Sequence, residues 1–338
     1  MNDWVDQVFC EDALAGLARI PDKSIDLILT DPPYNLGKDY GNDSDQLSVE
    51  EYLAWTESWI DRALPKLKDN GSLYLFLTWR HAPEIFVMLK KRMTMMNEII
   101  WDRRVPSMGG STRSFSSVHD TIGFFVKRKD YYFDLDAVRI PYDAATKKAR
   151  SRSIFVGAKW LEVGYNPKDM WSVSRLHREH AERVDHPTQK PLEIIERMLK
   201  ASCPPGGTVL DPFMGSGTTA VAAKRLGRHY AGFELNPAYC ALIAQRLAAP
   251  EVPVKKRTAA RKKTKTVLNA GTSTVVPAEA GTVPSHSSPQ VARMPRKNLD
   301  SRLRGKSSSA VPQDDGFSAN DQDVENVVHA LTTQGTPS

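Results

Sequence analysis

Short apolar runs recur along the first 235 residues and alternate with amphipathic segments of helical period. Seven runs have the length and residue types of strands, and their nearly continuous apolar character is typical of a sheet covered on both faces. The predicted strands are residues 6–10, 25–30, 71–78, 97–102, 120–128, 207–213 and 229–235. The pattern therefore predicts an α/β domain with a doubly wound, mostly parallel, seven-stranded sheet.

Helical segments lie between many of these runs. The segment at 48–67 spaces Tyr52, Trp55 and Trp59 along one face, and Pro191 stands at a favoured first helical position of the segment at 191–202. The predicted helices are residues 48–67, 83–92, 191–202, 218–227 and 236–249.

Two stretches break this alternation. Between residues 129 and 185 the periodicity fails and Arg, Lys, Tyr and Trp become frequent, which indicates an inserted recognition region. After Ala249 a basic run at 255–265 precedes a stretch rich in Ser, Thr, Pro and Gly, which predicts a mostly disordered tail with a short helix at 323–334. The predicted parts are 1–128 and 186–249 as two halves of one domain, 129–185 as the insert, and 250–338 as the tail.

Composition narrows the class of protein. The 338 residues are 41% hydrophobic and 25% charged, and none of their segments approaches the ~20 apolar residues of a membrane span. The N-terminus lacks the features of a signal peptide, so we expect a cytoplasmic protein without a membrane partner. A net charge of +6 weakly favours a polyanionic partner, although many basic proteins bind no nucleic acid.

The three cysteines are odd in number and scattered. Cys10, Cys203 and Cys240 lack the CxxC-type spacing of a zinc site. They fit buried thiols better than a disulfide framework, so we expect neither a disulfide nor a metal.

A glycine turn, DPFMGSGTTA at 211–220, sits between a predicted strand and a predicted helix. Gly215 and Gly217 allow close approach of a ligand to the helix N-terminus, and Glu234 ends the next strand about 20 residues on, where an acid binds a ribose hydroxyl. No Gly-Lys-Ser/Thr follows, which excludes a P-loop. An NAD domain would need further strands after this strand–helix–strand unit, but only the helix at 236–249 follows the strand at 229–235, so the sheet looks circularly permuted.

The apolar run at 25–30 ends abruptly in Asp31, Pro32, Pro33 and Tyr34. A nucleobase amine is a poor nucleophile, and two acceptors on its N–H bonds would hold it for reaction. Asp31 and the Pro32 carbonyl supply such acceptors, and Tyr34 can stack on a base that has left its duplex, worth roughly 1–3 kcal/mol. The alternative is a purely structural turn.

Four motifs carry a family resemblance. TDPPYN at 30–35, HPTQKP at 186–191, VLDPFMGSGTT at 209–219 and GFELNPAYC at 232–240 resemble, in that order, the β-group of amino-methylating DNA methyltransferases. The segments at 131–143 and 171–191 are similar to adenine-N6 methylases of type II restriction–modification systems, and the resemblance covers roughly residues 5–249.

The resemblance implies a permuted Rossmann-like domain that uses S-adenosyl-L-methionine without a metal to methylate double-stranded DNA. Asp31, Pro32, Pro33 and Tyr34 would be catalytic, and an acid at the first of these positions favours adenine-N6 over cytosine-N4. The implied cofactor residues are Asp12, Asp31, Thr188, Lys190, Asp211, Phe213, Gly215, Ser216, Gly217, Thr218, Glu234 and Asn236.

Loops at 35–46 and 103–117 have the glycines and charges of segments that close over DNA. We expect DNA contacts from Arg103, Arg104, Arg113, Arg139, Arg175 and Arg178, although ordinary solvated loop charge explains any one of them nearly as well. A non-catalytic DNA-binding protein and a small-molecule oxidoreductase are the competing readings. A cognate restriction endonuclease and a homodimer stay open.

Overall fold

The computed structural model describes most of the chain up to Pro250. One compact unit spans Met1–Thr258, and residues 251–338, with nearly all of the predicted tail and its helix at 323–334, lie outside the described residues. No helix within the described part is long and apolar enough to cross a bilayer. The described ranges are 3–37, 46–105, 112–151 and 158–250.

Within these ranges the strands form one eight-stranded sheet in the order β1-β8-β7-β2-β3-β5-β4-β6. Neighbours pair in parallel except where β5 meets β3 and β4. The strands are β1 (Gln7–Phe9), β2 (Ile25–Thr30), β3 (Leu67–Leu77), β4 (Thr94–Asp102), β5 (His119–Val126), β6 (Met170–Ser172), β7 (Thr208–Asp211) and β8 (His229–Phe233). All seven predicted runs overlap a strand, which confirms the mostly parallel α/β sheet.

The predicted count of seven strands was wrong by one. β6 pairs in parallel with the end of β4, placing Trp171 opposite Trp101. It comes from the region between residues 129 and 185, so that region adds an edge strand to the sheet as well as carrying loops. Three residues without periodicity inside a basic stretch give no strand signal, because strand recognition needs about four or more alternating positions.

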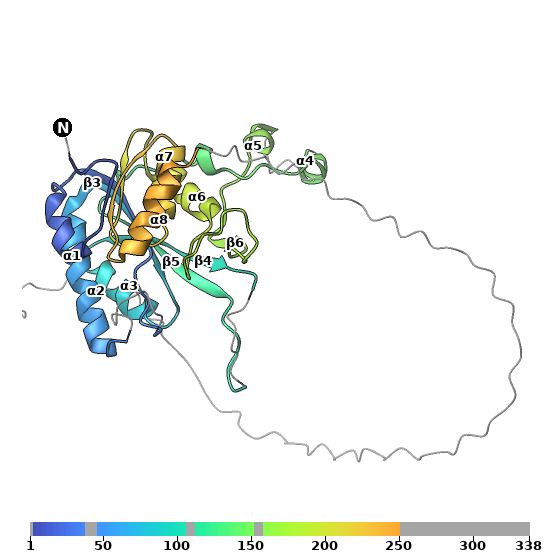
Figure 1. The fold of residues 1–338 in the computed structure, drawn as a ribbon. Coiled ribbons are helices and arrows are strands. Elements are labelled where there is room, and N and C mark those ends of the chain that lie inside the picture. The colour runs from blue at the N-terminus through green and yellow to red at the C-terminus, as the bar shows by residue number, and fades with distance from the viewer. Residues whose placement is uncertain (1–2, 38–45, 106–111, 152–157, 251–338) are drawn as a thin grey trace, which may run out of the picture. The chain divides into compact units, whose positions relative to one another are not determined.

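Helices cover both faces of the sheet (Figure 1). Along β3 the side chains alternate: Tyr74 and Phe76 join the core beneath the C-terminal helices, whereas Leu73 and Leu75 join the core beneath the N-terminal ones. The N-terminal layer is α1 (Ala13–Gly16), α2 (Val49–Ala63) and α3 (Ala82–Lys90), and the C-terminal layer is α6 (Leu192–Ser202), α7 (Thr218–Arg225) and α8 (Pro237–Ala248).

Capping residues explain where the longer helices begin. Ser48 and Glu51 form a capping box at the start of α2, in which each side chain accepts the other's backbone N–H. Asn236 caps α8 by accepting the backbone N–H of Ala238. Pro191 is the N-cap of α6, one position before the predicted one. The remaining short helices are η1 (Leu17–Arg19), η3 (Leu64–Lys66), η4 (Asp136–Val138), α4 (Ala144–Arg150) and α5 (Ala158–Val163).

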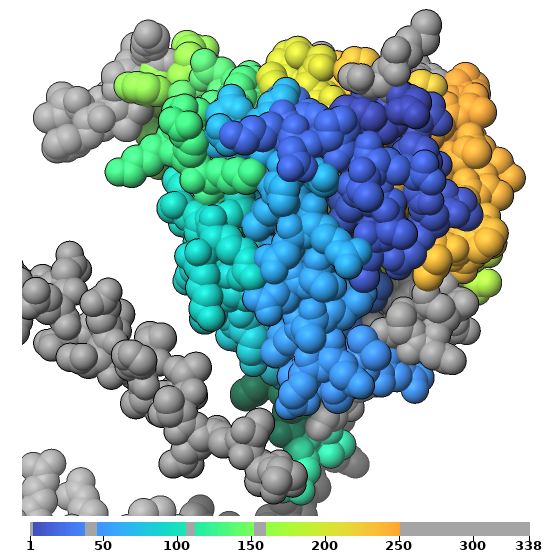
Figure 2. All heavy atoms as spheres, turned by 90° about the vertical axis from the view of Figure 1, so that its left-hand side faces the viewer, coloured from blue at the N-terminus to red at the C-terminus, as the bar shows by residue number. Residues whose placement is uncertain are grey.

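The order of strands in space differs from their order along the chain. β7 and β8 come last in the sequence but lie between β1 and β2. Figure 2 shows the consequence, with the N-terminal segment in dark blue directly beside the C-terminal segment in orange. β2 and β7 are parallel neighbours, with Leu27 opposite Val209, so the turns that follow them leave the same edge of the sheet.

Candidate active site

A cavity lies at that shared edge, where the turn after β2 meets the turn after β7. Side chains from the two most distant sequence motifs meet there, which fits a crevice at a topological switch point. Of the residues expected to be catalytic or to hold the cofactor, Pro32, Tyr34 and Gly217 do not line the cavity. Those that line it are Asp12, Asp31, Pro33, Thr188, Lys190, Asp211, Phe213, Gly215, Ser216, Thr218, Glu234 and Asn236.

The turn after β2 is held by side chains on both sides. Tyr34 is buried and its hydroxyl donates to Asp31 Oδ1, while the Lys190 ammonium donates to Asp31 Oδ2. Tyr52, from α2, donates its hydroxyl to the Pro33 carbonyl at 3.0 Å. These contacts fix the orientation of the Asp31 carboxylate at the wall of the cavity.

The glycine turn binds the carboxylate that ends β8. Gly215 and Gly217 both have positive φ, +50° and +74°, a conformation that glycine adopts without strain. The Gly215 N–H donates to Glu234 Oε2 at 2.7 Å, and the Asn236 N–H donates to Glu234 Oε1 at 2.9 Å. Burial raises the pKa of Glu234 above its ordinary value, although these two amides act in the opposite direction.

Asp211, at the end of β7, is buried, and both of its carboxylate oxygens accept hydrogen bonds. It accepts hydroxyls from Thr30 at 2.8 Å and Thr219 at 2.7 Å, and the backbone N–H of Phe213 at 3.1 Å. Burial raises its pKa to about 7. Asp211 therefore ties β2, β7 and the start of α7 together around the cavity.

Asp12 and His186 also line the cavity. Asp12 caps α1 by accepting the N–H groups of Leu14 and Ala15, a structural role that Asp commonly has at the start of a helix. His186 is buried and packs edge-on against the Tyr239 ring, at 4.5 Å between centroids. Burial lowers the pKa of His186 to about 4, so its imidazole is neutral at pH 7.

A second, larger groove adjoins the first cavity, and Thr188 and Lys190 line both. Tyr34 and three of the predicted DNA-contacting residues, Arg103, Arg175 and Arg178, line this groove. Its wall also includes Trp79, whose side chain is 58% exposed. The groove thus combines cations with an exposed aromatic ring beside Asp31.

The other three predicted arginines lie elsewhere. Arg104 donates to the Ser172 carbonyl and hydroxyl of β6, and Arg139 pairs with Asp136 within the insert. Arg113 is exposed and does not line the groove. The loop segments at 38–45 and 106–111 lie outside the described residues, so the expected loop closure over DNA stays a prediction.

Sequence reasoning missed several residues that line the first cavity. The sequence marked Trp55 only as part of the apolar face of α2, yet it lines the cavity, with its ring centre 5.3 Å from that of Phe213. Tyr239, on the first turn of α8, gave no signal beyond its place in the motif at 232–240. The other missed residues are Glu11, Ala13, Leu29, Phe76, His186, Ile195, Pro212, Met214, Thr219, Phe233 and Leu235.

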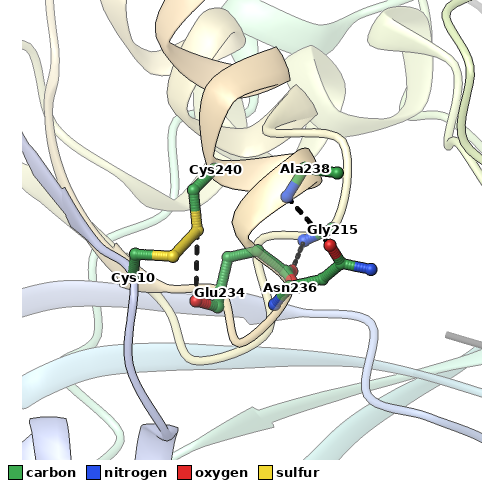
Figure 3. The surroundings of a disulfide bond; sticks show 6 residues. All are labelled: Cys10, Gly215, Glu234, Asn236, Ala238 and Cys240. Carbon is green, nitrogen blue, oxygen red and sulfur yellow. Dashed lines mark hydrogen bonds between the residues drawn. A yellow bond between two sulfur atoms is a disulfide. The ribbon is translucent and has the colours of Figure 1, made fainter. Parts of the chain in front are cut away.

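The expectation of three separate thiols was wrong. Cys10 and Cys240 form a disulfide with their Cα atoms 5.9 Å apart (Figure 3). The parallel pairing of β1 with β8 brings them together, although 230 residues separate them along the chain. Cys240 Sγ lies 3.4 Å from the Glu234 carbonyl oxygen, so the disulfide is adjacent to the backbone of the residue whose carboxylate the glycine turn binds. Cys203 is a buried thiol, as expected.

Residues 25–246 match the family N6_N4_Mtase, described as DNA methylase. The chain is 37% identical over 243 residues to the Type II methyltransferase M.HpaI of Haemophilus parainfluenzae, covering 71% of this chain and 74% of the relative. It is 39% identical over 237 residues to the Type II methyltransferase M1.MboII of Moraxella bovis, covering 66% and 89%.

Two solved structures share the fold. A crystal structure of the M1.HpyAVI–SAM complex has a TM-score of 0.53 at 23% identity and covers 72% of this chain and 99% of that one. The cytosine-N4-specific PvuII DNA methyltransferase has a TM-score of 0.55 at 21% identity, and the match covers 73% of this chain and 87% of that one. At these identities the similarity concerns the arrangement of strands and helices.

Proposed function

The chain belongs to the N6_N4_Mtase family of DNA methylases, and we propose that it moves a methyl group from S-adenosylmethionine to the N6 amine of an adenine in duplex DNA. One observation carries the proposal: Asp31 and Tyr34 from one turn, and Gly215 and Glu234 from the other, line adjoining cavities at one sheet edge. Methyl transfer needs a cofactor and an amine side by side, and this arrangement provides a place for each.

The residues of the glycine turn fit an adenosine-bearing cofactor. The lack of a side chain at Gly215 keeps the space beside His186 open, since an added Cβ would lie only 3.0 Å from His186 Nε2. Glu234 accepts backbone N–H groups on both oxygens, and a carboxylate with about four acceptor positions keeps capacity for a ribose hydroxyl. When bound, S-adenosylmethionine supplies the electrophilic methyl group on its sulfonium.

The chain's own part in the reaction is to hold the amine. Asp31 and the Pro32 carbonyl accept its N–H bonds, and Tyr34 stacks on the base. The base must leave the duplex to reach this depth, because Tyr34 is 6% exposed. Direct displacement needs no nucleophilic side chain, which suits a site whose described thiol, Cys203, is buried elsewhere and has its pKa raised to about 12 by burial.

Double-stranded DNA is the proposed partner, and the cationic groove beside Tyr34 is its proposed seat. The names of the Type II relatives favour methylation at one short sequence, together with a cognate endonuclease. A DNA substrate also agrees with the expected cytoplasmic location. Adenine is favoured over cytosine by the acid at position 31.

The test is sequencing with modified-base detection of plasmid DNA from cells that express the chain. We expect N6-methyladenine at one short motif, and its complete loss in the Asp31→Ala variant, because that variant lacks one of the two acceptors. The matched control is Asp130→Ala, which removes an exposed carboxylate whose described partner is Arg128.

Detection of N4-methylcytosine in place of N6-methyladenine would support methyl transfer to an amine but contradict adenine as the target base. An equal mark with Asp31→Ala would contradict the role of Asp31. A folded wild-type protein that binds DNA but leaves no mark in any sequence context would favour a non-catalytic DNA-binding protein.

A further inference from the structure

Lys190 occupies the boundary between the two cavities. It lines both the cofactor cavity and the groove beside Tyr34. It is only 7% exposed, and its ammonium lies 5.2 Å from the centre of the Phe76 ring and 5.4 Å from that of Tyr34. A cation this buried requires an anionic partner, because burial removes the water that would otherwise stabilise its charge.

That partner is Asp31. The ammonium donates to Asp31 Oδ2, while the Tyr34 hydroxyl donates to Oδ1. The two donors approach different oxygens, so together they oppose rotation of the carboxylate. Each oxygen still has a lone pair for a further donor, since an ionised carboxylate has about four acceptor positions.

We propose that Lys190 is a positioning residue for methyl transfer, acting through Asp31. In this role the ion pair holds the Asp31 carboxylate in the orientation that receives the target amine. The resemblance places Lys190 among the cofactor residues, whereas its contacts in the structure join it to Asp31, the proposed acceptor of the amine. The inference rests on the proposed function and adds a residue to its machinery.

The experiment measures kcat, KM for S-adenosylmethionine, and cofactor Kd by calorimetry, in wild type and Lys190→Met. Misplacing a reacting group by ~1 Å costs on the order of 100-fold. We therefore expect kcat at saturating cofactor to fall about 100-fold, with cofactor Kd changed less than about threefold. The matched control is Lys127→Met, which removes a partly buried lysine whose ammonium donates to the Leu67 carbonyl outside both cavities.

A second arm separates action through Asp31 from independent action. Single-turnover rates are compared for Asp31→Asn with and without Lys190→Met. Residues that act as one unit are not additive. We therefore expect the second substitution to cost less than about threefold in the Asp31→Asn background, against about 100-fold in wild type.

Two results overturn the inference: a large rise in cofactor Kd with kcat retained at saturation, or an equal loss in the Asp31→Asn background. If Lys190→Met fails to fold, Lys190→Arg decides. It keeps the cation with a different shape, so kcat should fall about tenfold with cofactor Kd retained, and the reverse pattern overturns the inference. A folded wild-type protein without transferase activity would overturn the proposed function, and this inference with it. An active wild-type protein supports the proposed function, so that only the variants then test the role of Lys190.

Discussion

At the residue scale, Gly215 combines two demands on one position. Its φ of +50° favours glycine, and an added Cβ would meet the buried His186 ring at 3.0 Å. Its N–H also supports Glu234. A side chain at this position therefore disturbs backbone, imidazole and carboxylate together.

The first prediction compares two alanine substitutions. Gly206 also has positive φ, +72°, but has open space around its added Cβ, so Gly206→Ala introduces backbone strain without crowding. We expect Gly215→Ala to weaken S-adenosylmethionine binding at least tenfold in calorimetry, and Gly206→Ala to leave it unchanged. Equal affinities for both variants would mean that crowding at the turn has no bearing on the cofactor.

Asp211 leads to a prediction about pH. Because burial raises its pKa from 3.8 to about 7, the folded protein binds this proton more tightly than the unfolded chain does. Stability from Asp211 is then greatest below pH 4 and is lost as pH rises towards 7. Between pH 5 and 8 we expect wild type to lose roughly 2–3 kcal/mol relative to Asp211→Asn. Urea unfolding at both values measures this difference, and parallel curves for the two proteins would contradict it.

At the element scale, the bridge joins the end of β1 to α8 behind Glu234. A disulfide across so long a segment restricts the unfolded chain, which stabilises the fold by roughly 2–5 kcal/mol. We expect a reductant to lower the free energy of unfolding of wild type by this amount and to leave Cys10→Ser unaffected. An equal response of the two proteins to reductant would place the effect elsewhere.

The elements also show how far sequence reasoning reaches. Continuous apolar runs marked seven strands, because a strand buried on both faces needs them. The catalytic and glycine turns were found because each follows such a run with residues that constrain the backbone. β6 was missed because its three residues are too few to show a strand pattern. The disulfide was missed because Cys10 and Cys240 meet only through the fold, 230 residues apart in the chain. The Lys190–Asp31 contact, 159 residues apart, was hidden in the same way.

At the scale of the whole molecule, the described site draws its residues from positions 11–239, and the family match ends at residue 246. We therefore expect a chain truncated after Pro250 to methylate its sequence at low salt as well as the full chain does. Loss of the basic run at 255–265 should weaken DNA binding most at low salt and make the remaining affinity depend less steeply on salt. Titrating binding of both chains against salt tests this, and an unfolded truncated chain would contradict it.

The Cys10–Cys240 bridge also changes the molecule as a mechanical object. Residues 10–240 form a covalent ring. A force applied between the two ends of the chain passes from Cys10 through the sulfur atoms to Cys240 and bypasses the ring. Stretched in an optical trap, the oxidised protein should lengthen only by its two outer segments, which include β1 and the end of α8. Once β1 has separated from β8, the strands β2 to β8 and both cavities should carry no load. Added reductant would open the ring and release its full contour length.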